Sequence, residues 1–119
     1  MCEEFSVSLP FPPSVNRIWR HARGRNYLSK HGQAFYNACV PMLRDMRCGM
    51  RPISGRVAVN ITLFPPTRAK RDIDNSIKAI LDALTRGHVW DDDSQVDVLV
   101  VVRGSVIKGG RADVSIKKI

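Results

Sequence analysis

Three stretches of the chain carry the apolar patterns of β-strands. Residues 5–9 and 56–64 alternate between apolar and polar positions, and prolines close both stretches. Residues 96–103 are so rich in valine that a buried strand is predicted there. A glycine-containing turn then leads to a last strand around 111–116. We therefore expect four strands.

Two segments between these strands have helical patterns. Apolar residues recur at intervals of three and four over residues 72–86, where an aspartate can cap the start of the helix and Gly87 ends it. A helix is also expected over about 30–48 with Ser29 as its N-cap, although Pro41 should kink or shorten it. The order β, α, β, α, β, β predicts an α+β fold: a single compact domain in which two main helices pack on a small mixed β-sheet.

Length and composition favour one domain over residues 1–119. The chain is 44% apolar and 25% charged, which is typical of a globular protein with a real core. It has no apolar run of 18 residues, and it opens with Glu3 and Glu4, so neither a membrane span nor an export signal is expected. The three cysteines form no CxxC pair, which predicts reduced thiols in a cytoplasmic protein.

Charge is unevenly distributed along the chain. Nineteen basic and eleven acidic residues give a net charge of +8, which predicts a polyanionic partner. Seven of the acids, all aspartates, fall in residues 72–97 with only two bases, so this window carries −5 and the rest of the chain +13. Carboxylates repel the phosphates that arginines attract, so nucleic-acid binding alone does not explain the cluster.

The aspartates are placed so that they can surround a cation. Asp72 and Asp74 flank the start of the 72–86 helix, and Lys78 lies one turn beyond Asp74 on the same face. The aspartate run 91–93 meets the helix start only if the strands on either side of this unit lie side by side. Crowded carboxylates favour a hard cation, which indicates Mg²⁺, with Mn²⁺ as a substitute, rather than zinc.

Simpler explanations exist for each acidic feature taken alone. Asp72 and Asp74 can act as a helix cap and a partner of the helix dipole, the run 91–93 as a solvated turn, and Lys78 as a solvated lysine. The three histidines have no metal-binding spacing, and no GxSxG or GxxxxGK[ST] motif occurs. An acidic window inside so basic a chain favours the joint, metal-binding interpretation over capping.

Two basic segments flank these elements. Residues 14–28 are too polar for the core and are expected to form a loop, in which four arginines are interleaved with Trp19 and Tyr27. These rings can stack on exposed bases, or the loop can fold over the sheet. Residues 67–71 form a second basic loop directly before the aspartates.

Several motifs, spread over nearly the whole chain, resemble a single family. They are Pro12-Pro-Ser-Val-Asn16-Arg17, Gly32-Gln-Ala34, Arg71-Asp-Ile-Asp-Asn75 followed by Lys78 and Asp82-Ala-Leu84, Trp90 with Asp92-Asp93 and Gln95-Val96, and Lys108-Gly-Gly-Arg111. Together they resemble the RusA-type Holliday junction resolvases, small homodimeric endonucleases associated with phages and prophages. The R-D-x-D-N-x-x-K core is the specific part of the resemblance.

This resemblance implies a homodimer with two active sites that cleaves four-way junction DNA with magnesium, without an organic cofactor or a membrane. Position by position, it places the catalytic residues at Asp72, Asp74, Asp93 and Lys78. The three catalytic aspartates would bind metal, with Asp92 as an accessory acid. Asp91 departs from the pattern, since an apolar or variable residue is expected there. The residues expected to contact DNA are Asn16, Arg17, Arg20, Arg23, Arg25, Arg68, Lys70, Arg71, Lys108 and Arg111.

We therefore expect a Mg²⁺-dependent, structure-specific endodeoxyribonuclease that resolves four-way junctions by paired symmetric phosphodiester cleavage, acting in DNA recombination and repair. Two alternatives remain open. One is a non-catalytic basic nucleic-acid-binding protein, in which the aspartates are caps and turns. The other is a metal-dependent nuclease that acts on other branched DNA.

Overall fold

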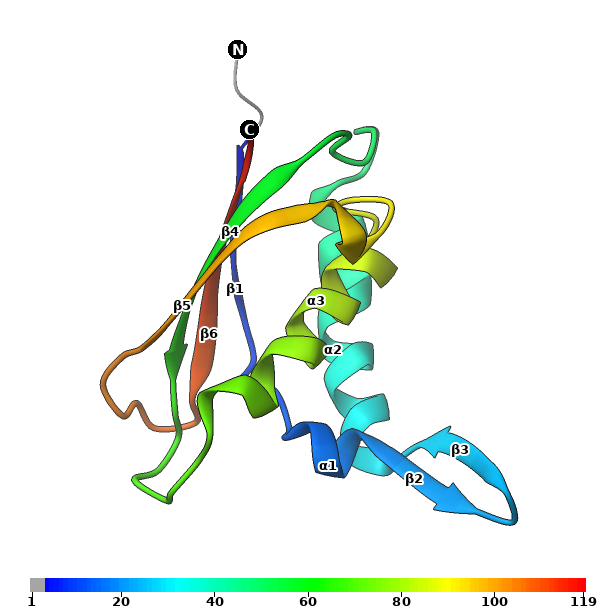
Figure 1. Ribbon diagram of the computed structural model, residues 1–119, viewed down its shortest axis with the longest axis vertical. Coiled ribbons are helices and arrows are strands. Elements are labelled where there is room, and N and C mark those ends of the chain that lie inside the picture. The colour runs from blue at the N-terminus through cyan, green and yellow to red at the C-terminus, as the bar shows by residue number, and fades with distance from the viewer. Residues whose placement is uncertain (1–3) are drawn as a thin grey trace.

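A mixed sheet of four strands forms one side of the molecule (Figure 1). The computed structural model describes residues 4–119, without the side chains of Val15, Asn16, Arg20, Ala22 and Asn26. The sheet has the order β1-β6-β4-β5, and its strands are β1 (Glu4–Leu9), β4 (Val57–Phe64), β5 (Val96–Arg103) and β6 (Arg111–Lys118). β6 is antiparallel to both of its neighbours, whereas β4 and β5 are parallel. The expected strands and the mixed sheet are confirmed.

Two main helices cover one face of this sheet. α2 spans Lys30–Met46 and α3 spans Ile77–Arg86, and Figure 1 shows both on the same side of the strands. The apolar side chains between the helices and the sheet include Leu9, Phe35, Leu43, Val59, Ile61, Ile80, Leu84, Trp90 and Ile116. Their removal from water is the main force that holds the layers together. The α+β architecture with two main helices is thus confirmed.

Pro41, which was expected to kink or shorten the first long helix, does not end it. α2 continues through Pro41 and ends at Met46, and the Ser29 hydroxyl caps its start by accepting a hydrogen bond from the Gly32 N–H at 3.1 Å. A proline removes one hydrogen bond to the carbonyl of Asn37, four residues earlier. Because Pro41 and Asn37 both lie on the exposed face of the helix, water can satisfy that carbonyl.

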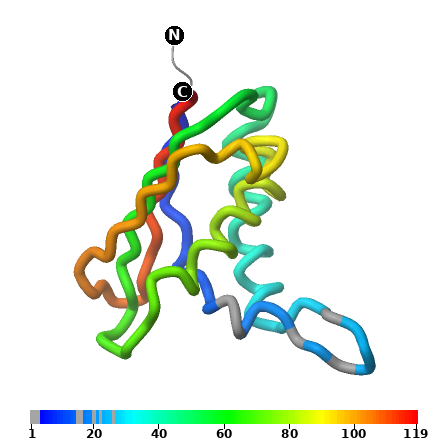
Figure 2. Tube along the Cα trace, viewed as in Figure 1, coloured from blue at the N-terminus to red at the C-terminus, as the bar shows by residue number. Residues whose placement is uncertain are grey.

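The segment 14–28, expected to be a loop, is structured. It contains a short helix, α1 (Val15–Ile18), and a β-hairpin of β2 (Trp19–Ala22) and β3 (Arg25–Leu28). The two residues between the strands, Arg23 and Gly24, both have positive φ, which two-residue hairpin turns of the primed type require. Figures 1 and 2 show the hairpin projecting from the body of the molecule. The polar composition concealed a strand pair because so little of it enters the core.

The valine-rich strand is also placed differently from the expectation. β5 is the outermost strand of the sheet, and most of its residues are exposed. The prediction that it is buried is therefore wrong. A run of valines fits a strand covered on both faces, but the helices cover only one face of this sheet. Among the described helices, none combines the length and apolar character needed to cross a membrane.

Candidate active site

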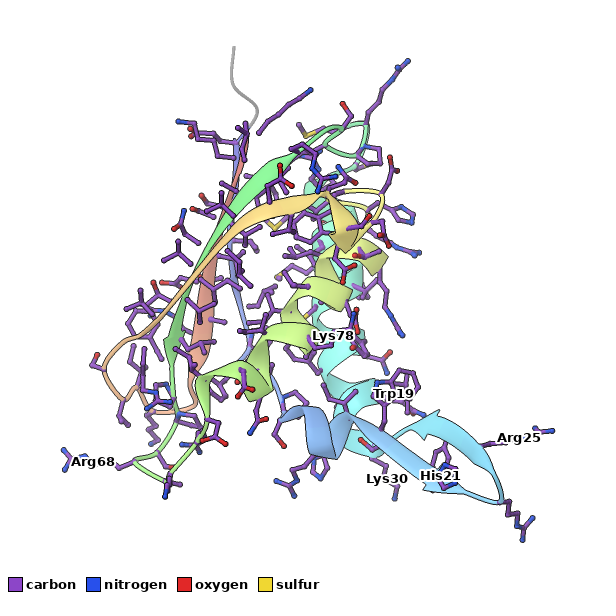
Figure 3. The ribbon with its side chains drawn as sticks, in the orientation of Figure 1. Trp19, His21, Arg25, Lys30, Arg68 and Lys78 are labelled. Carbon is purple, nitrogen blue, oxygen red and sulfur yellow. The ribbon has the colours of Figure 1, made fainter. Side chains whose placement is uncertain are left out.

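The connection from β4 to β5 returns the acidic turn to the start of α3. The two strands lie side by side in parallel, as the sequence interpretation required. Lys78, in the first turn of α3, places its Nζ 3.2 Å from Asp93 Oδ2 and 3.1 Å from Asp82 Oδ1 (Figure 3). One ammonium therefore joins the helix to the turn that follows it.

The two carboxylates keep Lys78 charged. Their hydrogen bonds, first that of Asp82 and then that of Asp93, raise the pKa of Lys78 above its ordinary value of 10.5. More than half of the lysine side chain remains exposed, at 59%. The ammonium is thus oriented by two anions and still accessible to a third.

The acidic turn itself is held by a capping box. A short 3-10 helix, η2 (Asp93–Gln95), begins there, and Asp92 Oδ2 accepts a hydrogen bond from the Ser94 N–H at 3.0 Å. Hydrogen bonding to the Ser94 side chain, and then to its backbone N–H, lowers the pKa of Asp92 below its ordinary value. The Gln95 side-chain oxygen accepts hydrogen bonds from the N–H groups of Asp91 and Asp92. Of the three consecutive aspartates, Asp93 is therefore the one directed at Lys78.

Two further contacts fix the turn to the core. The side-chain amide of Gln95 donates to the carbonyls of Ile53 and Gly55, each at 2.9 Å, in the segment that precedes β4. The buried Trp90 donates its indole N–H to Thr85 Oγ1 at 2.7 Å. The position of Asp93 is thus set by a neutral glutamine and a buried tryptophan on either side of it.

Asp72 and Asp74 lie at the other end of the site and are differently placed. They stand at the start of a 3-10 helix, η1 (Ile73–Ser76), which leads into α3. Both are exposed, and neither carboxylate accepts a hydrogen bond or an ion pair from a described residue. Asp72 occupies the N-cap position, but its side chain makes no capping contact. A capping role therefore does not account for these two residues.

A cleft of about 540 Å³ opens beside Asp72. Arg17, Lys70, Arg71 and Asn75 line it together with Asp72, so basic side chains and a carboxylate share one cleft. Phe11, Pro12 and Pro13 also line it. Within residues 4–119, no three His, Cys, Asp or Glu side chains are grouped so that they could hold a metal ion, so the expected convergence of Asp93 with Asp72 and Asp74 is not seen in the single chain. Any cation here would take its remaining ligands from water and substrate, as magnesium does.

The loop that precedes Asp72 is stabilised by its own arginine. The guanidinium of Arg71 donates to the carbonyls of Thr67 and Ala69 at 2.9 and 3.1 Å and stacks over Phe11 at 5.7 Å. Arg103, at the end of β5, donates to the Arg71 carbonyl at 2.6 Å. Arg71 therefore holds the loop in shape, whereas Figure 3 shows Arg68 projecting away from it.

The other residues expected to contact DNA are spread over two regions. Arg23 and Arg25 are exposed at the tip of the β2–β3 hairpin, which Figure 3 shows opposite Arg68. Lys108 is exposed in the β5–β6 connection, and Arg111 pairs with Asp113 at 3.1 Å. The side chains of Asn16 and Arg20 lie outside the described residues. Together these bases border the end of the molecule where the cleft opens.

Two residues of the site were not predicted to have a role. Asp82 binds Lys78, and the hydroxyl of Tyr36 on α2 donates to Asp82 Oδ2 at 3.4 Å. Burial, and then the charge of Asp82, raise the pKa of Tyr36 to about 12. The four-residue spacing of Lys78 and Asp82 was a signal for this ion pair, whereas nothing local in the sequence connects Tyr36 to it.

The chain is similar to proteins of one family over most of its length. The family model "Endodeoxyribonuclease RusA" matches residues 10–117. The chain is 39% identical over 112 residues to the crossover junction endodeoxyribonucleases RusA of Escherichia coli and Shigella sonnei, covering 94% of this chain and 92% of each relative. It is 38% identical over 112 residues to the crossover junction endodeoxyribonuclease of Enterobacteria phage 82, with the same coverage. The chain therefore belongs to the RusA family of endodeoxyribonucleases.

Proposed function

We propose that the chain is a magnesium-dependent endodeoxyribonuclease that resolves four-way DNA junctions in recombination and repair. One observation carries the proposal: an oriented and still accessible ammonium, Lys78, follows Asp74 by four residues and Asp72 by six, and no described residue neutralises these two carboxylates. The names of the relatives, crossover junction endodeoxyribonucleases, supply the junction as substrate. The net charge of +8 fits a polyanion.

The residues at the site fit a hard divalent cation. Asp72 and Asp74 present carboxylate oxygens without protein donors, and magnesium prefers oxygen ligands completed by water and phosphate. We propose these two residues and Asp93 as its ligands, with Asp92 as an accessory, and manganese as a substitute. A bound ion would lower the pKa of a water and neutralise charge on the scissile phosphate.

The other residues of the site act on the phosphodiester. The ammonium of Lys78 can bind a non-bridging phosphate oxygen as negative charge develops there, while Asp82 and Asp93 keep the ammonium protonated and aimed. Arg17 and Lys70 line the cleft beside Asp72 and would hold the backbone of the strand to be cut.

The substrate sets the number of protomers. A four-way junction has twofold symmetry, and its resolution needs two matched incisions, so we propose a homodimer with one site in each copy. Two copies would carry +16 and attract four phosphate-rich arms. Because many of the contacts would be ionic, junction affinity should fall steeply with salt. The free thiols described at Cys39 and Cys48 accord with a cytoplasmic location.

A magnesium titration with two labelled substrates tests the proposal. The parent protein should release product from a four-way junction and none from a linear duplex of the same sequence. Asp74→Asn should lose cleavage and keep junction binding, because it removes a metal ligand and a repulsive charge together. Asp45→Asn, which changes an exposed carboxylate on α2, should cut like the parent.

Each other outcome removes part of the proposal. Equal cutting of both substrates would indicate a general nuclease, and selective cutting of flaps or forks a nuclease for other branched DNA. Binding without product at any magnesium concentration would leave a non-catalytic binding protein. Retained cleavage by Asp74→Asn would refute the assignment of the site.

A further inference from the structure

The β2–β3 hairpin carries two aromatic rings outside the hydrophobic core. The side chains of Trp19 and Tyr27 are 43% and 50% exposed, whereas the second tryptophan of the chain, Trp90, is buried. Figures 1 and 3 show the hairpin extending away from the sheet and the two main helices. Large exposed rings on a projecting element are typical of a surface that a binding partner covers.

The two rings lie on opposite faces of the hairpin. Trp19 is paired with Leu28, and Tyr27 is paired with the next residue of β2. Side chains of successive pairs in a strand ladder point to opposite faces, so each face of the hairpin presents one ring. Because an aromatic ring binds the flat face of a nucleobase by stacking, the hairpin offers one such binding surface on either side.

The surroundings of these rings are basic. Residues 14–31 contain four arginines, one lysine and no acidic residue. Arg23 and Arg25 are exposed at the tip of the hairpin, and Arg17 and Lys30 are exposed where it joins the rest of the molecule. Basic side chains attract phosphates, and rings placed among them contact the nucleobases of the same strand. Charge complementarity therefore selects a nucleic acid as the partner of this surface.

The attached end of the hairpin is fixed to the core. The Ser29 N–H donates to the Ile18 carbonyl at 2.7 Å, and the Ser29 hydroxyl donates to the Arg17 carbonyl. Ile18 is buried, and a Cβ added to Gly32 of α2 would lie 2.8 Å from its carbonyl oxygen. This close approach requires a glycine at the start of α2. The rings are thus carried on an element whose attached end has one defined position.

The hairpin begins beside the cleft of the proposed active site. Arg17, two residues before Trp19, lines that cleft together with Asp72. Trp19 and Tyr27 belong to the first two pairs of the hairpin, within about 7 Å of its attached end at 3.3 Å per residue. Successive nucleotides of a DNA strand are about 3.4 Å apart along the helix axis. The rings therefore lie within a few base steps of a phosphate bound in the cleft.

We propose that the hairpin recognises the branch point of a DNA junction by stacking Trp19 and Tyr27 on the base pairs that flank the crossover. Inside a linear duplex every base pair is stacked on both faces, so an inserted ring must first separate two of them. At a crossover the helices end, and base-pair faces are available at a lower cost. With a ring on each face, the hairpin can stand between two such base pairs.

This inference deepens the function proposed above and rests on it for the identity of the substrate. It assigns the preference for a junction over a duplex to the hairpin, whereas the cleft and Lys78 serve cleavage. Phosphates are present in both kinds of DNA, so the basic residues attract both equally. Selectivity and cleavage should therefore be lost through different substitutions.

Equilibrium binding measured without magnesium tests the rings apart from cleavage. The double variant Trp19→Ala, Tyr27→Ala should bind a four-way junction about 100-fold more weakly than the parent, about tenfold for each ring, and a linear duplex of the same sequence with unchanged affinity. Trp19→Phe, Tyr27→Phe keeps both rings and should keep the preference for the junction. Met50→Ala, which removes a side chain that is 59% exposed outside the hairpin, should bind like the parent.

Circular dichroism shows whether each variant is folded. A folded alanine double variant that kept the preference for the junction would overturn the proposal. An equal loss of affinity for the junction and the duplex would also overturn it, because the rings would then bind DNA without recognising the branch point.

Tryptophan fluorescence provides a second, direct measurement. Trp90 is buried and Trp19 is exposed, so bound DNA should change mainly the emission of Trp19. At saturation the junction should quench the parent more strongly than the duplex does, and Trp19→Phe should abolish this difference. Equal quenching by both DNAs would refute the stacking. A parent that gives the expected binding and quenching but releases no product with magnesium would refute only the proposed function.

Discussion

The four aspartates closest to Lys78 in sequence or in space form two unlike pairs. Asp82 and Asp93 share its ammonium at 3.1 and 3.2 Å, whereas Asp72 and Asp74 accept nothing from the described residues. A carboxylate bound to a lysine orients that lysine, and a carboxylate without a donor retains its capacity to bind a cation. The same residue type thus has two kinds of surroundings within one short segment, with Asp93 proposed both to orient Lys78 and to bind metal, and substitutions should separate the two roles.

The largest effect is expected from the pair without partners. Asp72→Asn should reduce junction cleavage about 1,000-fold, the scale at which loss of transition-state charge stabilisation is measured. Its melting temperature should stay at the parental value because no protein contact is lost. Single-turnover cleavage and thermal unfolding measured on one preparation test both halves. A marked loss of stability would show that Asp72, like Asp82 and Asp93, makes a stabilising contact within the protein.

Removing the shared ammonium should cost less activity and more stability. Lys78→Met should reduce cleavage about 100-fold, since one donor to the phosphate is lost. It should also lower the melting temperature, because Asp82 and Asp93 then repel each other without a cation between them. Lys117→Met is the matched control, since Lys117 also faces an exposed carboxylate, Glu4, far along the chain from the site. If Lys78→Met and Lys117→Met changed cleavage and melting temperature equally, Lys78 would have no special role at the site.

Asp82 should have a smaller effect, through the orientation of Lys78. Asp82→Asn should reduce cleavage about tenfold, the scale typical of residues that position a functional group. It should also lower the pKa of Tyr36 from about 12, because the charge of Asp82 opposes ionisation of the phenol while burial remains. Spectroscopic titration, with Tyr36→Phe to identify the signal, measures this shift. If the pKa of Tyr36 were the same in Asp82→Asn as in the parent, Asp82 would not be in contact with Tyr36.

The smallest effect concerns stability at high pH. The pKa of Lys78 is raised in the folded protein, so its contribution is fully present below its ordinary pKa of 10.5 and is lost as the pH rises through the higher folded value. The contribution should be less than about 1 kcal/mol, since exposed ion pairs rarely contribute more. Urea unfolding of the parent and Lys78→Met on both sides of this pH measures the difference. If the difference in unfolding free energy between the parent and Lys78→Met grew as the pH rose, it would contradict this prediction.

The sequence predicted those parts of the molecule in which a local pattern and the three-dimensional packing agree. The alternation in β4 and the Ser29 cap of α2 are local signals, and the structure confirms both. β5 was misjudged because a valine run has the same composition whether one face of the strand is covered or both. The hairpin was missed because its turn depends on positive φ at Arg23, a residue type that rarely signals it.

At the site, the sequence predicts candidate residues but not the contacts that they make. Asp72, Asp74, Lys78 and Asp93 were named as catalytic candidates, and the structure places Asp93 on Lys78. The contact of Tyr36 with Asp82 joins residues 46 positions apart, a separation over which no periodicity operates. Which of the three consecutive aspartates turns toward the lysine depended on the capping of the turn by Asp92, a matter of backbone geometry rather than composition.

Gln95 uses every polar position of its amide: the oxygen takes two N–H groups of the acidic turn, and the nitrogen reaches two carbonyls before β4. No other side chain of the same shape can make all four of these hydrogen bonds. The substitution Gln95→Glu would keep the shape of the side chain and bring two carbonyls against an oxygen with no proton to give. Replacing one nitrogen atom would thus release the turn that carries Asp93. The proposed site thus depends on a neutral side chain that lies behind the carboxylates rather than among them.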